Sequence, residues 1–275
     1  MNQIKEYSSF NEAYLDIAKD LLNEGHDSQG TKEINNYSFK LTNIEDGNNI
    51  LTVAPVNYAY MCGEMLWYAG ANGQIDFINK FHSTGMNRTS ETQFANSAYA
   101  HIIFQRHGFN QLEQVIQILG HKPGSRRAII NLNVPDRHRE TIMDEICTIA
   151  LQFYINDGKL DCTGIMRSND AFGCLPYDLA FFTELQKTVA HRLNIPTGSY
   201  THFAVSFHAY ERDFEKLRNV GKMETPPKVT VDFSAICSNM LQLFSTINSH
   251  PEWTDTEYLK LFEETRCIFS DTKLI

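Results

Sequence analysis

The sequence predicts an α+β fold, a single domain in which one mixed β-sheet is flanked by helices, and three observations lead to it. Residues 147–156 and 159–167 are two apolar runs joined by Asn-Asp-Gly, which is the turn chemistry of a β-hairpin. Residues 175–193 are predicted to form a long helix. Helices and strands follow one another in mixed rather than strictly alternating order, which favours the α+β class.

The N-terminal part begins with a predicted amphipathic helix. Residues 9–12 have the form of a capping box, and apolar side chains recur at helical spacing until Gly25 offers a C-terminal stop. Residues 27–30 indicate a turn, and residues 37–42 alternate apolar and polar side chains like a half-buried strand. A largely apolar helix is expected over residues 56–69.

The rest of the chain contains one polar stretch and several further elements. Residues 70–97 are rich in Asn, Ser, Thr and Gly and have no clear period, which predicts a long surface loop with a short helix. No linker rich in Pro, Gly or Ser divides the chain, so we expect one domain over residues 1–275. The other expected elements are a helix over residues 112–120, strands over residues 128–134 and 200–210, a helix over residues 233–247 and a C-terminal tail over residues 250–275.

Composition excludes several classes of function. The formal charge of -9 argues against a nucleic-acid surface, because duplex binding needs a basic stripe that neutralises phosphates. The N-terminus has no apolar signal region, and no run of about 18 apolar residues occurs. We therefore expect a cytoplasmic protein that neither is exported nor spans a membrane.

The cysteines show neither CxxC pairs nor zinc-type spacing with histidine, so a structural metal is not expected. Reduced thiols are expected in the cytosol. The six are Cys62, Cys147, Cys162, Cys174, Cys237 and Cys267.

Cys147 stands out from the other cysteines because of the arginines around it. A cysteine at the start of a strand is more often a small buried hydrophobe than a nucleophile. Here, however, Arg126 and Arg127 stand at a strand entrance and Arg167 precedes Ser168 at the end of the hairpin. Three guanidiniums can gather a phosphate dianion, and cations favour thiolate over thiol. The alternative for each arginine is surface solvation or pairing with some of the 33 acidic residues.

Several spaced motifs follow one another along the chain. They are residues 64–68, 125–127, 152–155, 157–160, 167–170, 175–178 and 208–210. Through these motifs the chain resembles the thymidylate synthase superfamily. The resemblance covers roughly residues 9–215 and is specific, because many separate motifs agree in order and spacing.

The resemblance implies a role for each matched position. Cys147 would attack carbon 6 of a pyrimidine, with Tyr99 beside it, and Glu64 would manage protons and water near the base. The family is dimeric, and its members hold the nucleotide with residues of both subunits. The 5'-phosphate would be held by Arg167 and Ser168 together with Arg126 and Arg127 from the partner subunit, the sugar hydroxyl by His208 and Tyr210, and the folate by Asp170 and Tyr177.

One departure from the family concerns the base. Synthases place Asn where this chain has Asp178, and a carboxylate accepts from the N4 amine of cytosine, whereas the amide suits uracil. This Asp is similar to that of the phage-type deoxycytidylate hydroxymethylases, as are Thr148, where synthases have His, and residues 166–170. The alternative is a synthase that has drifted and tolerates Asp.

A second departure concerns the fate of the transferred carbon. Synthases carry tryptophans beside the folate, but this chain has only Trp67 and Trp253, and it ends in residues 271–275 without the family's C-terminal tail. Less exclusion of water would let water rather than hydride add to the exocyclic methylene. A hydroxymethyl product is therefore expected.

The leading hypothesis is a homodimer that hydroxymethylates dCMP or CMP at carbon 5, with 5,10-methylenetetrahydrofolate as the one-carbon donor. The alternatives are methylation or hydroxymethylation of dUMP, or a catalytically idle nucleotide-binding homologue. The loop at residues 27–30 lacks the family's phosphate-binding Arg, and Lys32 is either its substitute or a surface lysine. Nothing in the sequence explains Cys174, which stands where the family has Gly.

Overall fold

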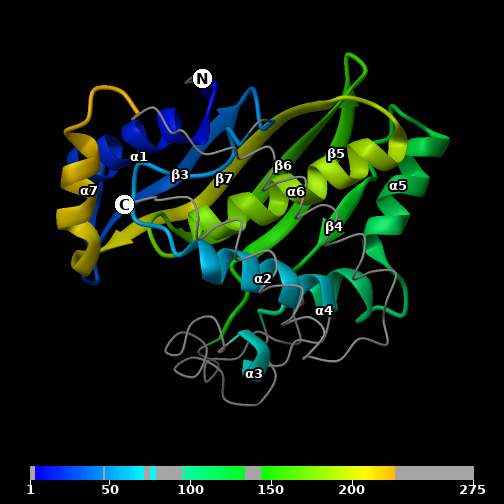
Figure 1. Cartoon of the computed structure of the whole chain (residues 1–275), viewed down its shortest axis with the longest axis horizontal. Helices are drawn as coiled ribbons and strands as arrows, with labels where there is room; N and C mark the ends of the chain where they lie inside the picture. The colour runs from blue at the N-terminus through cyan, green and yellow to red at the C-terminus, as the bar shows by residue number, and fades with distance from the viewer. Residues whose placement is uncertain are drawn as a thin grey trace. The chain divides into compact units, whose positions relative to one another are not determined.

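The computed structural model describes residues 4–45, 47–70, 75–78, 95, 97–133 and 144–226 (Figure 1). The chain divides into two compact units, and each is described by itself. The first consists of Met1–Val56, Leu112–Ile130 and Cys147–Thr230, and the second of Asn57–Gln111, Asn131–Ile146 and Val231–Ile275.

The first unit is built on a seven-stranded mixed sheet in the order β1-β3-β7-β6-β5-β4, with β2 paired to β3. β6 and β7 run parallel, as do β1 and β3, whereas β3 and β7, β5 and β6, and β2 and β3 are antiparallel. This arrangement confirms the predicted fold class. The strands are β1 Lys5–Tyr7, β2 His26–Ser28, β3 Thr31–Leu41, β4 Ile129–Asn131, β5 Thr148–Asn156, β6 Lys159–Asp170 and β7 Thr197–Tyr210.

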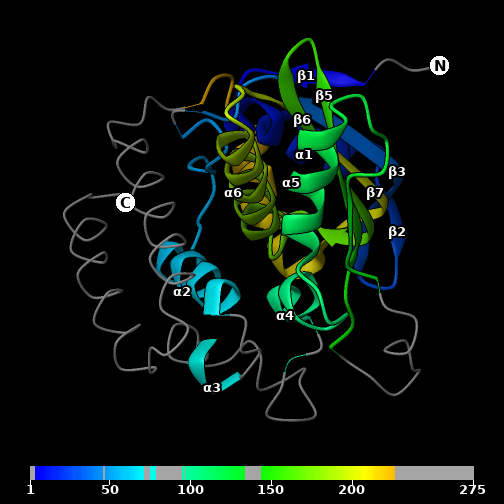
Figure 2. The ribbon, with the colours of Figure 1, turned by 90° about the vertical axis from the view of Figure 1, so that its right-hand side faces the viewer.

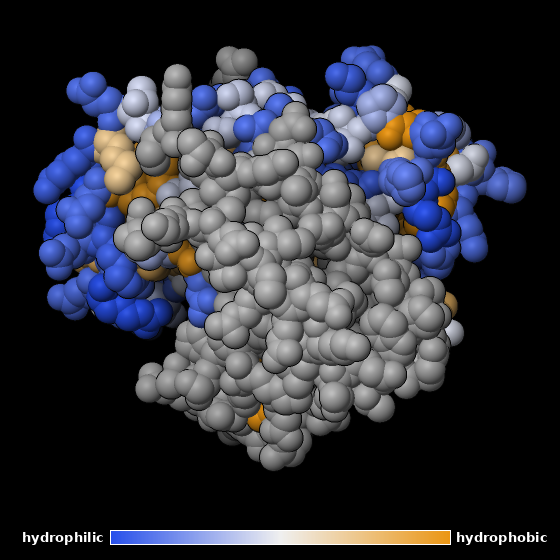
Figure 3. All heavy atoms as spheres, in the orientation of Figure 1, coloured by the Kyte–Doolittle hydropathy of each residue, from blue (hydrophilic) through white to orange (hydrophobic). Residues whose placement is uncertain are grey.

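Helices cover one side of this sheet. Figure 2 shows α1, α5 and α6 on the same side, and α1 packs on β3 while α6 packs on β6 and β7. In the view of Figure 3 the described residues show mostly hydrophilic side chains at the surface. None of the described helices is long and apolar enough to cross a bilayer. The helices are α1 Phe10–Glu24, α5 Gln111–His121, α6 Leu175–Leu193, η3 Glu211–Asp213 and α7 Phe214–Gly221, and in the second unit α2 Tyr58–Gly70, α3 Ile75–Ile78 and α4 Tyr99–Phe104.

Local sequence signals set several of these elements. The Ser9 hydroxyl accepts from the backbone N–H of Glu12 at 3.3 Å and so caps α1. Asp157 and Gly158 both have positive φ, which is the geometry of the two-residue turn that matches the twist of a hairpin. β5 and β6 therefore form the predicted hairpin, and α6 has the predicted bounds.

Other elements differ from the prediction. The turn at residues 27–30 is the tip of a hairpin between β2 and β3, and β4 ends at Asn131, three residues early. The short elements β1, α4 and α7 were not predicted, because three to eight residues carry too little periodicity. α3 is the short helix expected within residues 70–97, while most of that stretch, the helix at residues 233–247 and the tail at residues 250–275 lie outside the described residues. One domain over residues 1–275 stays a prediction.

β6 and β7 change the face that they bury at the same level of the sheet. In β6 even-numbered positions are buried up to Met166, and Asn169 is the next residue buried. β7 behaves alike, since even positions are buried from Tyr200 to Ala204 and Phe207 is the next buried residue. Met166 pairs with Ala204 and Asn169 with Phe207, so the two changes lie side by side. Beyond this level Asn169 faces the helix layer.

His202 is a titratable group enclosed in this core. It has no solvent exposure, its ring stacks on Phe39 with centroids 5.3 Å apart, and its Nδ1 lies 3.1 Å from the Tyr200 hydroxyl. Burial lowers the pKa of His202 to about 3, because a charged imidazole loses its hydration there. The folded protein therefore keeps this imidazole neutral.

We expect acid to destabilise the core through His202. Because the folded pKa lies below the unfolded value near 6.5, the unfolded chain takes up the proton first as the pH falls, and stability is lost from about pH 6.5 down to about pH 3. Between pH 7 and 4.5 this group removes about 3 kcal/mol from the free energy of unfolding. In urea unfolding His202→Phe should flatten that pH dependence, whereas His121→Asn, on the exposed end of α5, should retain it. An unchanged slope in His202→Phe would contradict the assignment.

Candidate active site

Cys147 lies directly before β5 and next to Arg167 of β6. The Arg167 backbone N–H donates to the Cys147 carbonyl at 2.9 Å, and Arg167 Nη2 lies 3.6 Å from Cys147 Sγ. The thiol is partly exposed. A guanidinium at this distance stabilises a thiolate relative to a thiol. The pair thus has the electrostatics of a nucleophile and an anion-binding cation.

The carboxyl ends of the parallel strands β6 and β7 bring together four of the predicted site residues. The register places Ser168 opposite Ser206 and Asp170 opposite His208. Tyr210 follows His208 by two residues in β7. The rings of His208 and Tyr210 meet edge to face with centroids 5.2 Å apart. Hydroxyl, imidazole and carboxylate groups therefore gather at one end of the sheet.

Asp170 and Tyr210 are linked by Arg212, to which sequence analysis assigned no role. The Asp170 carboxylate is almost buried, accepts from the Phe172 backbone N–H at 3.0 Å and lies 3.7 Å from Arg212 Nη2. The same guanidinium lies over the Tyr210 ring, 4.3 Å from its centroid. A basic residue directly after the family-like run at residues 208–210 was the signal that could have pointed to Arg212.

Tyr210 is held in its neutral form. Burial raises the pKa of this phenol, and the nearby Asp170 carboxylate raises it further against the opposing effect of Arg212. A neutral phenol can donate a hydrogen bond to a hydroxyl.

Asp178 occupies the first turn of α6. Its backbone N–H and that of Tyr177 both donate to the Cys174 carbonyl at 3.0 Å, so the turn begins at the exposed Cys174. The Asp178 carboxylate accepts from Asn169 Nδ2 at 2.8 Å. Asn169 is 1% exposed, so β6 anchors this carboxylate from within the core. Tyr177, the predicted folate contact, is partly exposed beside it.

Glu64 and Tyr99 lie in the second unit and are connected through Tyr68. Glu64 accepts from the Tyr60 hydroxyl at 3.1 Å and from the Tyr68 hydroxyl at 3.4 Å. The Tyr68 ring stacks on that of Tyr99, with centroids 5.4 Å apart. The tyrosine hydroxyls hold the Glu64 carboxylate in place within α2, and the roles of Glu64 and Tyr99 toward Cys147 stay predictions.

Arg126 and Arg127 are not gathered with Arg167. Both are exposed before β4, and the Arg126 carbonyl accepts from Gln152 Nε2 at 3.2 Å. Gln152 is five strand residues from Cys147, which corresponds to about 17 Å along β5. Within one chain these two arginines therefore do not complete the anion site beside Cys147.

Lys32 forms an ion pair across the β2–β3 hairpin. Its Nζ lies 2.9 Å from Asp27, and in the sheet Lys32 is opposite Ala209, between His208 and Tyr210. The charge of Lys32 is thus neutralised by Asp27, which favours the interpretation of Lys32 as a surface lysine over a phosphate ligand.

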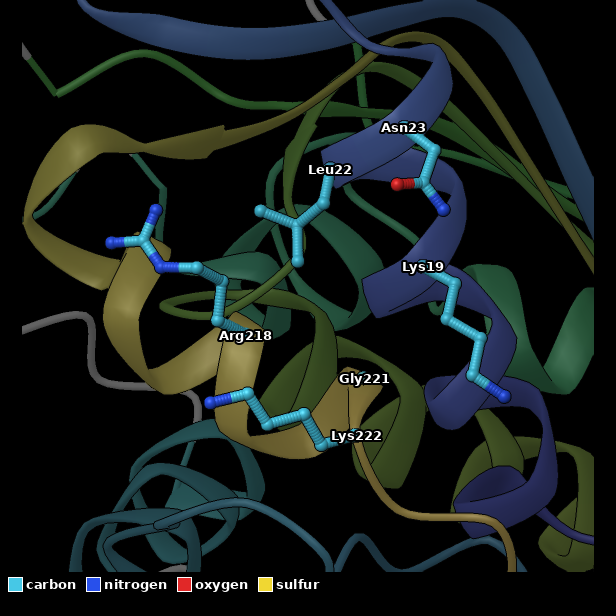
Figure 4. Close-up of a pocket in the computed structure, with 6 residues that line it drawn as sticks. All are labelled: Lys19, Leu22, Asn23, Arg218, Gly221 and Lys222. Carbon is cyan, nitrogen blue, oxygen red and sulfur yellow. The ribbon is translucent and has the colours of Figure 1, made fainter.

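A second basic surface lies between α1 and α7, where a shallow hollow is lined by Lys19, Leu22, Asn23, Arg218, Gly221 and Lys222. Figure 4 shows the Lys19 amine pointing away from the guanidinium of Arg218. Cations that diverge in this way do not converge on one anion. The site residues at the ends of β6 and β7 remain the better candidate for ligand binding.

The fold and these side chains indicate a class of protein: a mixed-sheet enzyme with a thiol beside an arginine. The family model described as thymidylate synthase matches residues 12–246, and the chain therefore belongs to the thymidylate synthase family. It is a folate-dependent one-carbon transferase that acts on a pyrimidine nucleotide.

A solved structure supports the same fold. The chain is similar to thermostable thymidylate synthase A from Bacillus subtilis, with a TM-score of 0.64 and 23% sequence identity over 80% of this chain and 87% of the other. Enzymes of this family use methylenetetrahydrofolate as the one-carbon donor. The individual site residues named above stay predictions.

Proposed function

We propose that the enzyme hydroxymethylates carbon 5 of a cytidine monophosphate, dCMP or CMP. The observation that carries this proposal is the Asp178 carboxylate, which Asn169 holds at 2.8 Å in the first turn of α6. In this family that position faces the Watson-Crick edge of the base. A carboxylate accepts from the N4 amine of cytosine, whereas the O4 of uracil offers it only a second acceptor. A mispaired polar group in such a site costs a few kcal/mol, which is enough for strong discrimination.

Cys147 carries the covalent step. Its thiolate forms a bond to carbon 6, and the electron pair of the 5,6 double bond makes carbon 5 nucleophilic. Carbon 5 would then take the methylene that bound 5,10-methylenetetrahydrofolate supplies and lose its proton, while the bond from the methylene to the folate nitrogen breaks and tetrahydrofolate is released. Water would add to the resulting exocyclic methylene of the nucleotide, and the sulfur would leave carbon 6 as thiolate. Arg167 Nη2 lies 3.6 Å from Sγ. Its guanidinium stabilises the thiolate both before the attack on carbon 6 and when the sulfur leaves in the last step.

The remaining groups bind and orient the nucleotide. Arg167 and Ser168 hold the 5'-phosphate with a cation and a hydroxyl, and His208 with the neutral phenol of Tyr210 binds the sugar hydroxyl. Asp178 accepts from the N4 amine and stabilises the protonated N3 of the ring. By the family resemblance Glu64, whose carboxylate accepts from two tyrosine hydroxyls, would direct water near carbon 5.

The side chains predicted to hold the folate have chemistry that suits it. Asp170 presents an almost buried carboxylate, a group that accepts from the N–H donors of a pterin, and Tyr177 lies partly exposed at the start of α6. When bound, 5,10-methylenetetrahydrofolate supplies a methylene at the oxidation level of formaldehyde. Arg212 and the Phe172 backbone N–H hold the Asp170 carboxylate in a fixed orientation.

A homodimer would complete the phosphate site. The face of the sheet away from α6 carries Ile165 and Phe203 in register, and Val205 beside them is 44% exposed. An apolar sheet face of this kind suits a second copy of the same chain. Arg126 and Arg127 are exposed and remote from their own Cys147, so we assign them to the site of the partner subunit.

Mixed dimers test this assignment. A chain with Cys147→Ser and a chain with Arg126→Ala and Arg127→Ala should each be inactive as homodimers. Co-expressed, they form dimers in which one site combines an intact Cys147 with intact arginines. We expect activity to return to roughly a quarter of the wild-type value, because half of the dimers are mixed and each has one complete site. Mixtures that stay inactive would show that the arginines act within their own chain.

A single assay tests the proposed activity. Wild-type enzyme is incubated with tetrahydrofolate, formaldehyde and either dCMP, CMP or dUMP labelled with deuterium at carbon 5. We expect loss of the label and a product heavier by one hydroxymethyl group with a cytidine nucleotide, and no rise in dihydrofolate absorbance. Conversion of dUMP with formation of dihydrofolate, and none of dCMP or CMP, would identify a thymidylate synthase instead.

A further inference from the structure

We propose that Asn169 is a positioning residue that holds Asp178 as an ionised acceptor and so sets the preference for an amino-pyrimidine. The inference rests on the proposed function, because it takes Asp178 to face the base. Asn169 touches neither nucleotide nor folate in this proposal and acts through Asp178 alone.

The geometry of the two elements produces the contact. Up to Met166 the even positions of β6 face the helix layer, and the change of face beyond that level turns Asn169 inward. Asn169 is 1% exposed, and its Nδ2 donates to Asp178 Oδ2 at 2.8 Å. A strand residue thereby fixes a helix residue that is nine positions further along the chain. The carboxylate cannot rotate without losing this bond.

The direction of the hydrogen bond selects a protonation state. An ionised carboxylate only accepts, so it matches the amide N–H₂ that Asn169 presents to it. A protonated Asp178 would instead offer a donor, for which the amide would have to turn its Oδ1 toward the acid. The observed orientation therefore favours the ionised form, which is the form that accepts from the N4 amine of cytosine.

The side-chain oxygen of Asn169 also bears on the role of this residue. Asn169 Oδ1 is buried and has no hydrogen-bond partner among the described residues. An unpartnered buried acceptor is unfavourable, so a polar side chain is kept here at a cost to the stability of the fold. The gain lies at Nδ2, where the bond to a charged group is stronger than a neutral one.

The test replaces the amide by an apolar group of similar size. Asn169→Leu removes the donor, and we expect kcat/KM for the preferred cytidine nucleotide to fall about 30-fold with little change for dUMP. The acid limb of the pH profile should move to higher pH, because the ionised form of Asp178 has lost its donor. Asn169→Ser keeps a hydroxyl donor in a smaller side chain and should recover part of both effects.

Asn49 provides a matched control. It is also fully buried, and its Nδ2 donates at 2.8 Å to Thr183, which is likewise on α6. Asn49→Leu removes a buried amide donor to α6 in the same way, but it should leave the ratio of kcat/KM for dCMP and dUMP and the pH profile unchanged. Loss of fold alone would alter both variants equally.

These measurements distinguish the role of Asn169 from the proposed activity on a cytidine nucleotide. If wild type converts a cytidine nucleotide but Asn169→Leu and Asn169→Ser keep its selectivity and pH profile within twofold, Asn169 has only a structural role and the inference is overturned. If wild type converts only dUMP, the proposed function fails, and the inference with it. A change in selectivity and in the acid limb, present in Asn169→Leu and absent from Asn49→Leu, supports both.

Discussion

Asp178→Asn should reverse the base preference of the enzyme. The amide accepts from the N3–H of uracil and donates to its O4, whereas it leaves the cytosine edge mispaired. We expect kcat/KM for the cytidine nucleotide to fall by at least about 100-fold and that for dUMP to rise above it, since one mismatched buried polar contact costs a few kcal/mol. Steady-state kinetics with dCMP, CMP and dUMP measure the change.

Asp170→Asn is the control for this reversal. It makes the same chemical change at the end of β6, at a carboxylate that we assign to folate rather than to the base. It should slow all nucleotides by a similar factor and raise the KM for folate. If Asp178→Asn also slowed all nucleotides equally, the carboxylate would not be reading the base.

Cys147→Ser should abolish turnover. A serine hydroxyl is far less acidic than a thiol, and Arg167 alone does not ionise it, so the adduct at carbon 6 does not form. We expect kcat to fall by at least about 1,000-fold, while nucleotide binding, measured by calorimetry, stays within a few-fold of wild type. Loss of deuterium from carbon 5 should stop as well, because it depends on the same adduct.

Cys162→Ala separates this effect from the loss of any thiol. Cys162 lies fully buried in the middle of β6, where burial strongly raises the pKa of its thiol. Its removal should lower stability by about 1 kcal/mol and leave kcat unchanged. Turnover that survived Cys147→Ser, or vanished with Cys162→Ala, would contradict the choice of nucleophile.

Local signals were sufficient for much of the fold. The capping serine of α1, the Asp157-Gly158 turn and α6 depend on neighbouring residues, and the structure has them where the sequence predicts them. The change of buried face in β6 and β7 has no such signal. It lies at paired positions of the two strands, and a strict alternation read along either strand misses it.

Some residues of the candidate site could be predicted from the sequence and others could not. The arginines around Cys147 single it out in the sequence, and Arg167 belongs to a family-like motif. The hairpin register then brings the guanidinium to the sulfur. Asn169 and Arg212 were given no role, since an amide and a surface arginine are common residues. Their importance depends on Asp178 and Asp170, which contact them only in the folded protein.

The amino-acid order by itself determined the family and the fold class and predicted the reactive groups, because these depend on residue types at fixed spacing. Tertiary structure decided which groups touch: the Asn169 amide reaches the Asp178 carboxylate, and Arg212 joins Asp170 to Tyr210. The physical reason is that hydrogen bonds and ion pairs act over a few ångströms in space, a distance that strand pairing and helix packing set.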